Sequence, residues 1–257
     1  MIDLLLPAFF LSVVLLGIHA YFGLEIIRRG IIFTDLAIGQ MAALGAAVSI
    51  LFFHGEFHYP LSLAFALLAG LLNSIAAKRV KHLEAFIGLV YAFGVSGVFV
   101  LLSKSEHGTE ELSNLLATDI IFVESSDIIR TAILYLVIGL IIFVLKRKVS
   151  GFLKELLFFT AFAVTVTSSV KMAGVFVVFA LLIAPVFIVL KLTRKHHVLW
   201  AWLIGIVINL LAIMFAYFLD LPTGYAIVFL HTAIAIIVAF KSELKGTGSD
   251  ETSATGT

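Results

Sequence analysis

The chain has 257 residues, of which 62% are hydrophobic and only 13% are charged, and its formal net charge at pH 7 is +1. An ordinary globular domain is about 45–50% apolar, so this composition and a mean hydropathy of +1.17 argue against a water-soluble domain and for a lipid environment. The chain has no cysteine, which excludes disulfides and thiolate chemistry, and its cations are too dispersed to form a nucleic-acid surface.

Nine hydrophobic segments are candidates to cross a membrane, which takes about 17–25 apolar residues. They lie at 4–24, 31–53, 60–77, 86–103, 128–145, 156–170, 174–191, 198–219 and 223–240. Backbone polar groups in lipid must be satisfied within their own segment, so each segment is expected to be a helix. The sixth is short and rich in Ser and Thr, so eight or nine complete crossings both remain possible. The sequence predicts an all-α integral membrane bundle.

The basic residues predict the orientation of this bundle. All but Lys104, Arg130 and Lys171 of the seventeen Lys and Arg residues fall in alternate connections between the segments. Cationic loops stay on the cytoplasmic side, so we expect the N-terminus outside and the C-terminus inside. Residues 1–245 then form the transmembrane domain, and the Gly/Ser/Thr-rich residues 246–257 form a disordered cytoplasmic tail.

Two polar side chains of the second segment are candidates to flank a translocation pathway. Asp35 and Gln40 are five residues apart, which separates them by roughly 140° around a helix. A carboxylate inside a membrane segment is a functional hypothesis by default. Alternatively, Asp35 pairs with Arg28 or Arg29 or caps a helix start, and Gln40 bonds a neighbouring helix.

Other polar groups inside the segments are most simply interhelical hydrogen-bonding groups. They are His19, Asn73, Asn209 and His231. His231 stands deep in the last segment and is our third candidate for the pathway. Small residues cluster in the second and fourth segments, which predicts that both helices lie inside the bundle.

The expected outer loops contain His54, His58 and His107 beside several glutamates. Imidazole and carboxylate groups bind zinc, manganese and iron, so these histidines are candidate metal ligands. Alternatively, the loops are ordinary solvated connections. Two proline sites are structural candidates. Pro185 lies mid-segment, where it favours a kink, and Asp220, Pro222 and Gly224 form a turn in which Pro fixes φ and Gly frees it.

Four stretches of the chain share their order and spacing with a known family. They are residues 28–45, the segment N-L-L-A-T-D-I-I-F-V at 114–123, G-V-F-V-V-F-A-L-L-I-A-P at 174–185, and D-L-P-T-G-Y-A-I-V at 220–228. From residue 24 to 240 the chain thus resembles the permease subunit of binding-protein-dependent ABC importers for zinc, manganese or iron.

The resemblance implies a permease of the inner membrane that moves a divalent or chelated metal ion inward. It implies a homodimeric or heterodimeric pore, with the homodimer favoured, an ABC ATPase subunit and an extracytoplasmic metal-binding protein. ATP hydrolysis would take place on the partner, since this chain has no nucleotide-binding loop. The chain would therefore be neither an enzyme nor the holder of a tightly bound cofactor.

Two departures from the family pattern stand out. Many members carry an Asp and a His four residues apart in the second helix, where this chain has Leu36 and Gln40. The segment that docks the ATPase is also shortened here, to residues 146–155. Either residues 150–155 form a minimal docking turn, or the chain couples differently from its relatives. The candidate docking residues are Lys148, Gly151, Lys154 and Glu155.

Two other functions remain open on the sequence. A secondary carrier would use Asp35 or His231 as a proton relay and would work without an ATPase. A non-transporting membrane scaffold would explain the short loop. An intramembrane enzyme has little support, because the chain has no Ser-His-Asp order and no HExxH-type motif.

Overall fold

The computed structural model describes residues 2–105, 120–193 and 195–254. Within these ranges the regular structure is entirely helical. The elements are α1 (Ile2–Arg29), α2 (Thr34–Phe53), α3 (His58–Arg79), α4 (Leu83–Leu102), the 3-10 turn η1 (Ile120–Phe122), α6 (Ser125–Leu145), α7 (Gly151–Ala173), α8 (Val175–Leu192), α9 (His197–Phe218) and α10 (Thr223–Ala254).

The described ranges contain nine helices that are long and apolar enough to cross a membrane, which confirms the predicted multi-pass fold. The sixth candidate is an unbroken helix of 23 residues, so the predicted limits of 156–170 were too narrow. The sequence prediction assigned Lys154 and Glu155 to the preceding loop because they are charged. In the structure they belong to the first turns of α7, at the end of the bundle where charged groups reach the membrane surface.

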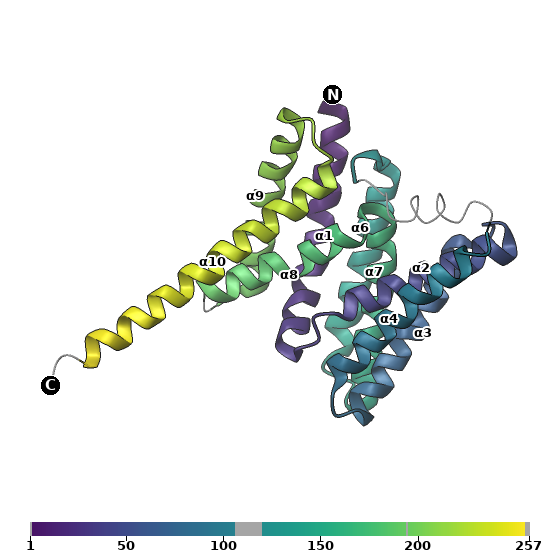
Figure 1. Ribbon diagram of the computed structural model, residues 1–257, viewed down its shortest axis with the longest axis horizontal. Helices are drawn as coiled ribbons and strands as arrows, with labels where there is room; N and C mark the ends of the chain where they lie inside the picture. Colours follow the sequence, from purple (N-terminus) through teal and green to yellow (C-terminus); the bar gives the residue numbers. More distant parts are fainter. Residues whose placement is uncertain (1, 106–119, 194, 255–257) are drawn as a thin grey trace.

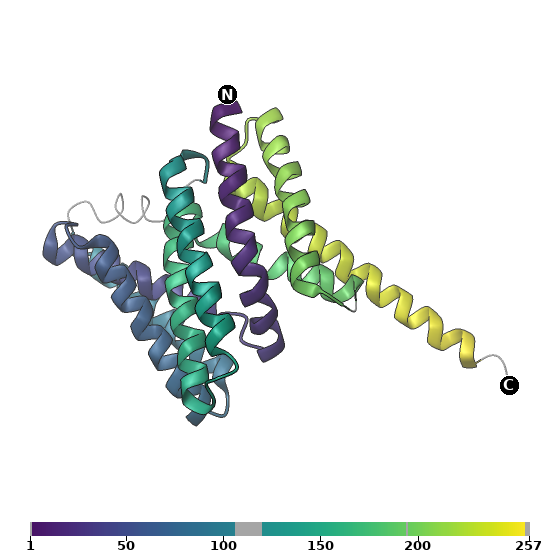
Figure 2. The same ribbon diagram turned by 180° about the vertical axis from the view of Figure 1, so that it is seen from behind.

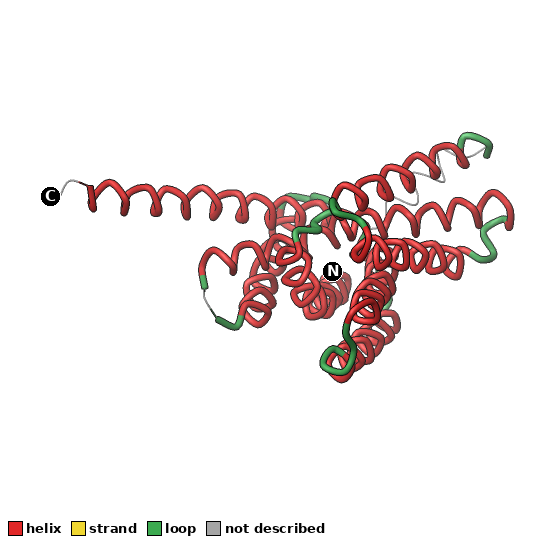
Figure 3. The backbone as a smooth tube through the Cα atoms, turned by 90° about the horizontal axis from the view of Figure 1, so that it is seen from below, coloured by secondary structure: helices red, strands yellow, loops and turns green. Residues whose placement is uncertain are grey.

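The helices form two groups on either side of α1 (Figures 1 and 2). On one side α2 packs against α3, α4 and α7, and on the other α8, α9 and α10 pack against one another. α1 contacts α6, α8 and α9 and thereby joins the two groups. The view from below in Figure 3 shows the N-terminus among the helices and the end of α10 far from them.

Small residues bring α2 close to its neighbours, as the sequence predicts. A Cβ atom at Gly45 would overlap the carbonyl oxygen of Leu61 in α3. A Cβ atom at Gly94 in α4 would lie 3.0 Å from the Cβ of Gln40. Such contacts allow close van der Waals packing between helices, which replaces the hydrophobic driving force that lipid removes.

The prediction that the fourth segment lies inside the bundle is only half correct. α4 buries the face that carries Gly94 and Gly97 against α2, but its opposite face is open. Leu89 and Phe93 on that face are 70% and 65% exposed. The small residues therefore mark one buried face of α4 and not a helix that is surrounded on all sides.

Both proline sites lie in well-defined backbone. α8 continues unbroken through the buried Pro185. In the turn before α10 the left-handed residue is Asp220, with φ of 53°, and Pro222 directly precedes the helix. Gly224 lies in the first turn of α10, so the expectation that it frees the turn backbone was wrong. An Asp tolerates the left-handed region because its short polar side chain can bond locally.

α10 extends through residues 246–254, where the sequence predicts a disordered tail. Figures 1 and 3 show this end of α10 projecting away from the other helices. Its Gly/Ser/Thr-rich composition favours disorder over a helix that has no neighbour to stabilise it. The disordered tail stays a prediction.

Candidate functional site

Two carboxylates lie at the start of α2 and α4. Asp35, in the first turn of α2, is only 2% exposed, and its Oδ1 atom has no hydrogen-bond partner among the described residues. Glu84, in the first turn of α4, accepts a hydrogen bond of 3.1 Å at Oε1 from the backbone N–H of Phe33. Its Oε2 atom is buried and also has no hydrogen-bond partner within residues 2–105, 120–193 and 195–254. The negative charge of Glu84 acts on Asp35.

This arrangement is suited to a cation. A buried carboxylate oxygen without a partner costs free energy, and a second negative charge nearby increases the cost. The positive ends of the α2 and α4 dipoles offset only part of it. Carboxylate oxygens are the preferred ligands of hard divalent cations. Two carboxylates are fewer ligands than a resident metal site needs.

The structure does not support an ion pair between Asp35 and an arginine. The Nη1 atom of Arg29 lies 2.6 Å from Oε2 of Glu155, and its Nε atom lies 3.7 Å from Oε2 of Glu25. Its guanidinium also covers the ring of Phe158 at 4.1 Å. Among the described residues no ion pair joins Asp35 to Arg28 or Arg29. The residue before α2 is Phe33, which makes no side-chain cap.

Gln40 lies further along α2, half-buried against Gly94 of α4. Asp35 is within electrostatic reach of Glu84, which also belongs to α4. The structure therefore brings both predicted pathway residues to the α2–α4 contact, although they are not on one face of α2. We use the name α2–α4 seam for Asp35, Gln40, Glu84 and Gly94.

His231 lies elsewhere, between α9 and α10. Its Nε2 atom is 2.8 Å from Oδ1 of Asn209, and both side chains are buried. α10 packs on α8 and α9, whereas α2 packs mainly on α3, α4 and α7. The structure thus separates His231 from the α2–α4 seam and gives it a hydrogen bond between helices.

Two of the predicted outer histidines lie at the facing ends of consecutive helices. His54 ends α2 in the left-handed conformation, with φ of 52°, and His58 begins α3. His107 lies outside the described residues. Among the described residues there is no group of three or more His, Asp or Glu side chains that could hold a metal ion. The outer metal site stays a prediction.

The candidate docking residues surround a short connection. α6 ends at Leu145 and α7 begins at Gly151, so residues 146–150 join them without a further helix. Lys148 and Lys154 are exposed, and Gly151 has a φ of 60°. Glu155 differs, because its ion pair with Arg29 ties it to α1. It therefore faces other helices of the bundle.

Sequence reasoning missed Glu84. The predicted fourth segment begins at residue 86, so the prediction places Glu84 in the preceding basic loop. The small residues of the second and fourth segments could have indicated that α4 packs against α2. The carboxylate at the start of α4 would then have become a candidate. No spacing within one segment could have paired it with Asp35.

The fold and the seam define a class of protein: a multi-pass helical membrane protein with acidic groups in its membrane segments. Residues 1–153 and 149–242 match the ABC 3 transport family, and the chain belongs to that family. It is accordingly a membrane permease of the metal-type ABC transporters, located in the inner membrane. The two matched segments meet at residues 149–153, next to the short connection before α7.

Similar proteins carry names that refer to metal transport. The "Manganese transport system membrane protein MntC" of Listeria innocua is 30% identical over 84% of this chain and 82% of that protein. A "Probable iron transport system membrane protein" of Haemophilus influenzae is 25% identical over 93% of this chain and 89% of that protein. Among solved structures, PsaBC from Streptococcus pneumoniae in complex with Fab has the same fold, with a TM-score of 0.72, 18% identity and coverage of 91% and 90%.

Proposed function

We propose that this permease moves a divalent or chelated metal ion into the cell, powered by a separate ABC ATPase subunit. The observation that carries this proposal is the pair of carboxylates at the α2–α4 seam, each with a buried oxygen that has no hydrogen-bond partner in the ranges that the structure describes. In a protein of this family, such a pair is best explained as a place where the transported cation is briefly held.

The direction of transport rests on the predicted orientation. Basic residues lie in the last turns of α1 and α3 and directly after α6, which places them at one end of an alternating bundle. If that basic end is cytoplasmic, the seam carboxylates lie near the cytoplasmic mouth of the pathway. The ion would then leave the membrane past Asp35 and Glu84.

The donor groups favour one kind of cargo. Asp35, Gln40 and Glu84 offer only oxygen atoms to a passing metal ion, since the amide oxygen of Gln40 replaces an imidazole. Oxygen ligands suit manganese better than they suit softer ions. We therefore propose manganese or iron ahead of zinc, in agreement with the names of the similar proteins.

The partners follow from the class. We propose a homodimer in the membrane, an extracytoplasmic metal-binding protein as donor and an ATPase at the connection 146–150. With Glu155 held by Arg29, the docking surface narrows to Lys148, Gly151 and Lys154.

A test should separate the permease from its two rivals. The tagged chain is purified from its own membranes in mild detergent, and copurifying proteins and metal are identified by mass spectrometry. Metal uptake is measured in the same cells with and without an ionophore. We expect a copurifying ABC ATPase and uptake that survives collapse of the proton gradient. Uptake that collapses with the ionophore, without any ATPase, would instead indicate a secondary carrier.

One observation favours a second candidate function, a membrane scaffold that transports nothing. The α6–α7 connection is short, and the match to the family is divided at that point. A scaffold predicts stable partner proteins together with unchanged cellular metal uptake when the gene is deleted. Reduced uptake on deletion excludes it.

A further inference from the structure

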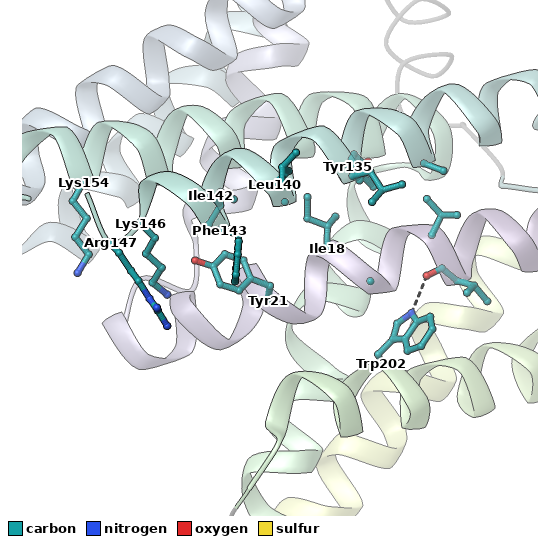
Figure 4. A pocket seen from close by; sticks show the side chains of 16 residues that line it. Ile18, Tyr21, Tyr135, Leu140, Ile142, Phe143, Lys146, Arg147, Lys154 and Trp202 are labelled. Carbon is teal, nitrogen blue, oxygen red and sulfur yellow. Dashed lines mark hydrogen bonds between the residues drawn. The ribbon is translucent and has the colours of Figure 1, made fainter. Parts of the chain in front are cut away.

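A groove of about 1100 Å³ opens on the outside of the bundle between α1, α6 and α9 (Figure 4). Its walls are mostly apolar and include Ile18, Leu140 and Phe143. Gly139 of α6 lines it, and a Cβ atom there would meet no atom within 4 Å. The groove is therefore open along the membrane-spanning part of α6, and no side chain of the described residues fills it at Gly139.

Three cations stand at one end of this groove: Lys146, Arg147 and Lys154 (Figure 4). Lys146 is neutralised within the chain, because its Nζ atom lies 2.8 Å from Oε1 of Glu25. Arg147 and Lys154 are exposed and belong to none of the ion pairs found in the described ranges. The end of the groove thus carries two positive charges that nothing in this part of the chain compensates.

The depth of these cations matches the membrane surface. Arg147 follows the last turn of α6, and Lys154 lies in the first turn of α7, where the apolar spans Ser125–Leu145 and Gly151–Ala173 end and begin. An apolar groove beneath a basic end has the same arrangement as a phospholipid, with acyl chains below a phosphate. Basic pockets between membrane helices recognise anionic headgroups in this way.

We propose that this groove binds one anionic phospholipid, independently of the transport proposed above. Its phosphate contacts Arg147 and Lys154, and an acyl chain lies beside Gly139 and Phe143. A second copy of the chain is a poorer occupant, because a symmetric contact would bring the same two uncompensated cations together. The bound lipid would fill the space between α1 and α6 and neutralise the start of the α6–α7 connection.

The experiment uses the full chain in nanodiscs of phosphatidylcholine and phosphatidylglycerol in equal amounts. Native mass spectrometry after release into detergent counts the lipids retained by each protein. We expect the wild type to retain one phosphatidylglycerol in preference to phosphatidylcholine. The double variant Arg147→Gln/Lys154→Gln should bind phosphatidylglycerol about 30-fold more weakly, the effect of two basic residues at a membrane surface.

A second variant tests the apolar part of the groove without changing its charge. Gly139→Phe places a ring in the open space and should also abolish the retained phosphatidylglycerol. Two matched controls should behave as the wild type. Lys78→Gln/Arg79→Gln removes two exposed cations at the end of α3, and Gly88→Phe fills a position of α4 that also has no atom within 4 Å.

Three kinds of result would overturn the proposal. The first is equal retention of both lipids by the wild type, or unchanged retention of phosphatidylglycerol by both groove variants. The second is displacement of phosphatidylglycerol by inorganic phosphate alone, which would make a free anion the ligand. The third is loss of a copurifying protein from the double variant while lipid retention stays unchanged, which would assign the two cations to a protein partner.

Discussion

Two polar regions of this bundle differ in how well their groups are satisfied. Between α1, α6 and α7, Tyr135 lies 2.6 Å from the Oγ atom of Ser169, and Ser169 lies 3.2 Å from Nε2 of His19. The Nδ1 atom of His19 is 2.7 Å from the carbonyl oxygen of Leu15. At the α2–α4 seam, by contrast, Asp35 and Glu84 each keep a buried oxygen that no group in the described part of the chain hydrogen-bonds.

The difference separates structural from functional polarity. A satisfied network within the membrane holds helices together, because each member would be costly alone. A buried carboxylate that stays unpaired weakens the fold, and it persists where something outside the chain satisfies it. Residue type alone does not make this distinction, since the histidine of the first region is a good metal ligand in principle.

The largest expected effect concerns Glu84 at the seam. Glu84→Gln keeps the acceptor for the Phe33 N–H but removes the negative charge. We expect metal uptake to fall by about 10- to 100-fold, the range for losing a charged contact. Uptake of radioactive manganese by whole cells, normalised to protein in the membrane, measures it. Glu124→Gln, at an exposed carboxylate before α6, is the matched control. Equal uptake by both variants would remove Glu84 from the pathway.

A second prediction tests the close packing of α2 against α3. Gly45→Ala would place a methyl group on the Leu61 carbonyl, so α2 and α3 must separate. We expect the free energy of unfolding in mixed micelles to fall by about 1–3 kcal/mol, as in other overpacked cores. Gly88→Ala meets no neighbouring atom and should be neutral or slightly stabilising. Equal stability of the two variants would contradict the described α2–α3 contact.

A substitution in the hydrogen-bonded network between α1, α6 and α7 should lower stability and leave transport unchanged. Tyr135→Phe removes the hydroxyl that bonds Ser168 and Ser169. The expected loss is about 1 kcal/mol in the free energy of unfolding, with metal uptake per folded molecule unchanged. Tyr225→Phe, at an exposed position of α10, serves as the control. A loss of uptake without a loss of stability would move Tyr135 into the pathway.

The smallest effect belongs to the ion pair between α1 and the end of α6. Burial alone lowers the pKa of Lys146, but its hydrogen bonds to Glu25 and Tyr21 and its charge interactions with them together outweigh burial and hold that pKa above the usual 10.5. The pair therefore stabilises the fold below pH 10.5, and its contribution is lost as the pH rises through the higher pKa of the folded protein.

Lys146 is partly exposed, so Lys146→Met should cost no more than about 1 kcal/mol at neutral pH. The difference from the wild type should shrink as the pH rises above the usual lysine pKa. Lys78→Met, at an exposed cation without a described ion pair, should cost nothing at either pH. A difference that is constant with pH would mean that packing of the lysine stem, and not its charge, stabilises the fold.

The sequence predicts the coarse features because they follow from the solvent. Hydrophobic length predicts nine spans, the small residues predict a closely packed α2, and the intramembrane Asp35 is a candidate without any structure. Contacts between residues of different segments could not be predicted from the sequence. The partners of Arg29 lie both four residues away and 126 residues away in the chain, at Glu25 and Glu155, and the neighbour of Asp35 lies at the start of α4.

The most direct test of the account is one variant, Asp35→Asn, measured for both stability and transport. If Asp35 is an uncompensated charge that serves a passing ion, the variant should unfold no more easily than the wild type, and metal uptake should be largely lost. A variant that unfolds more easily but transports metal normally would show that Asp35 holds the fold together. That result would contradict the proposed pathway.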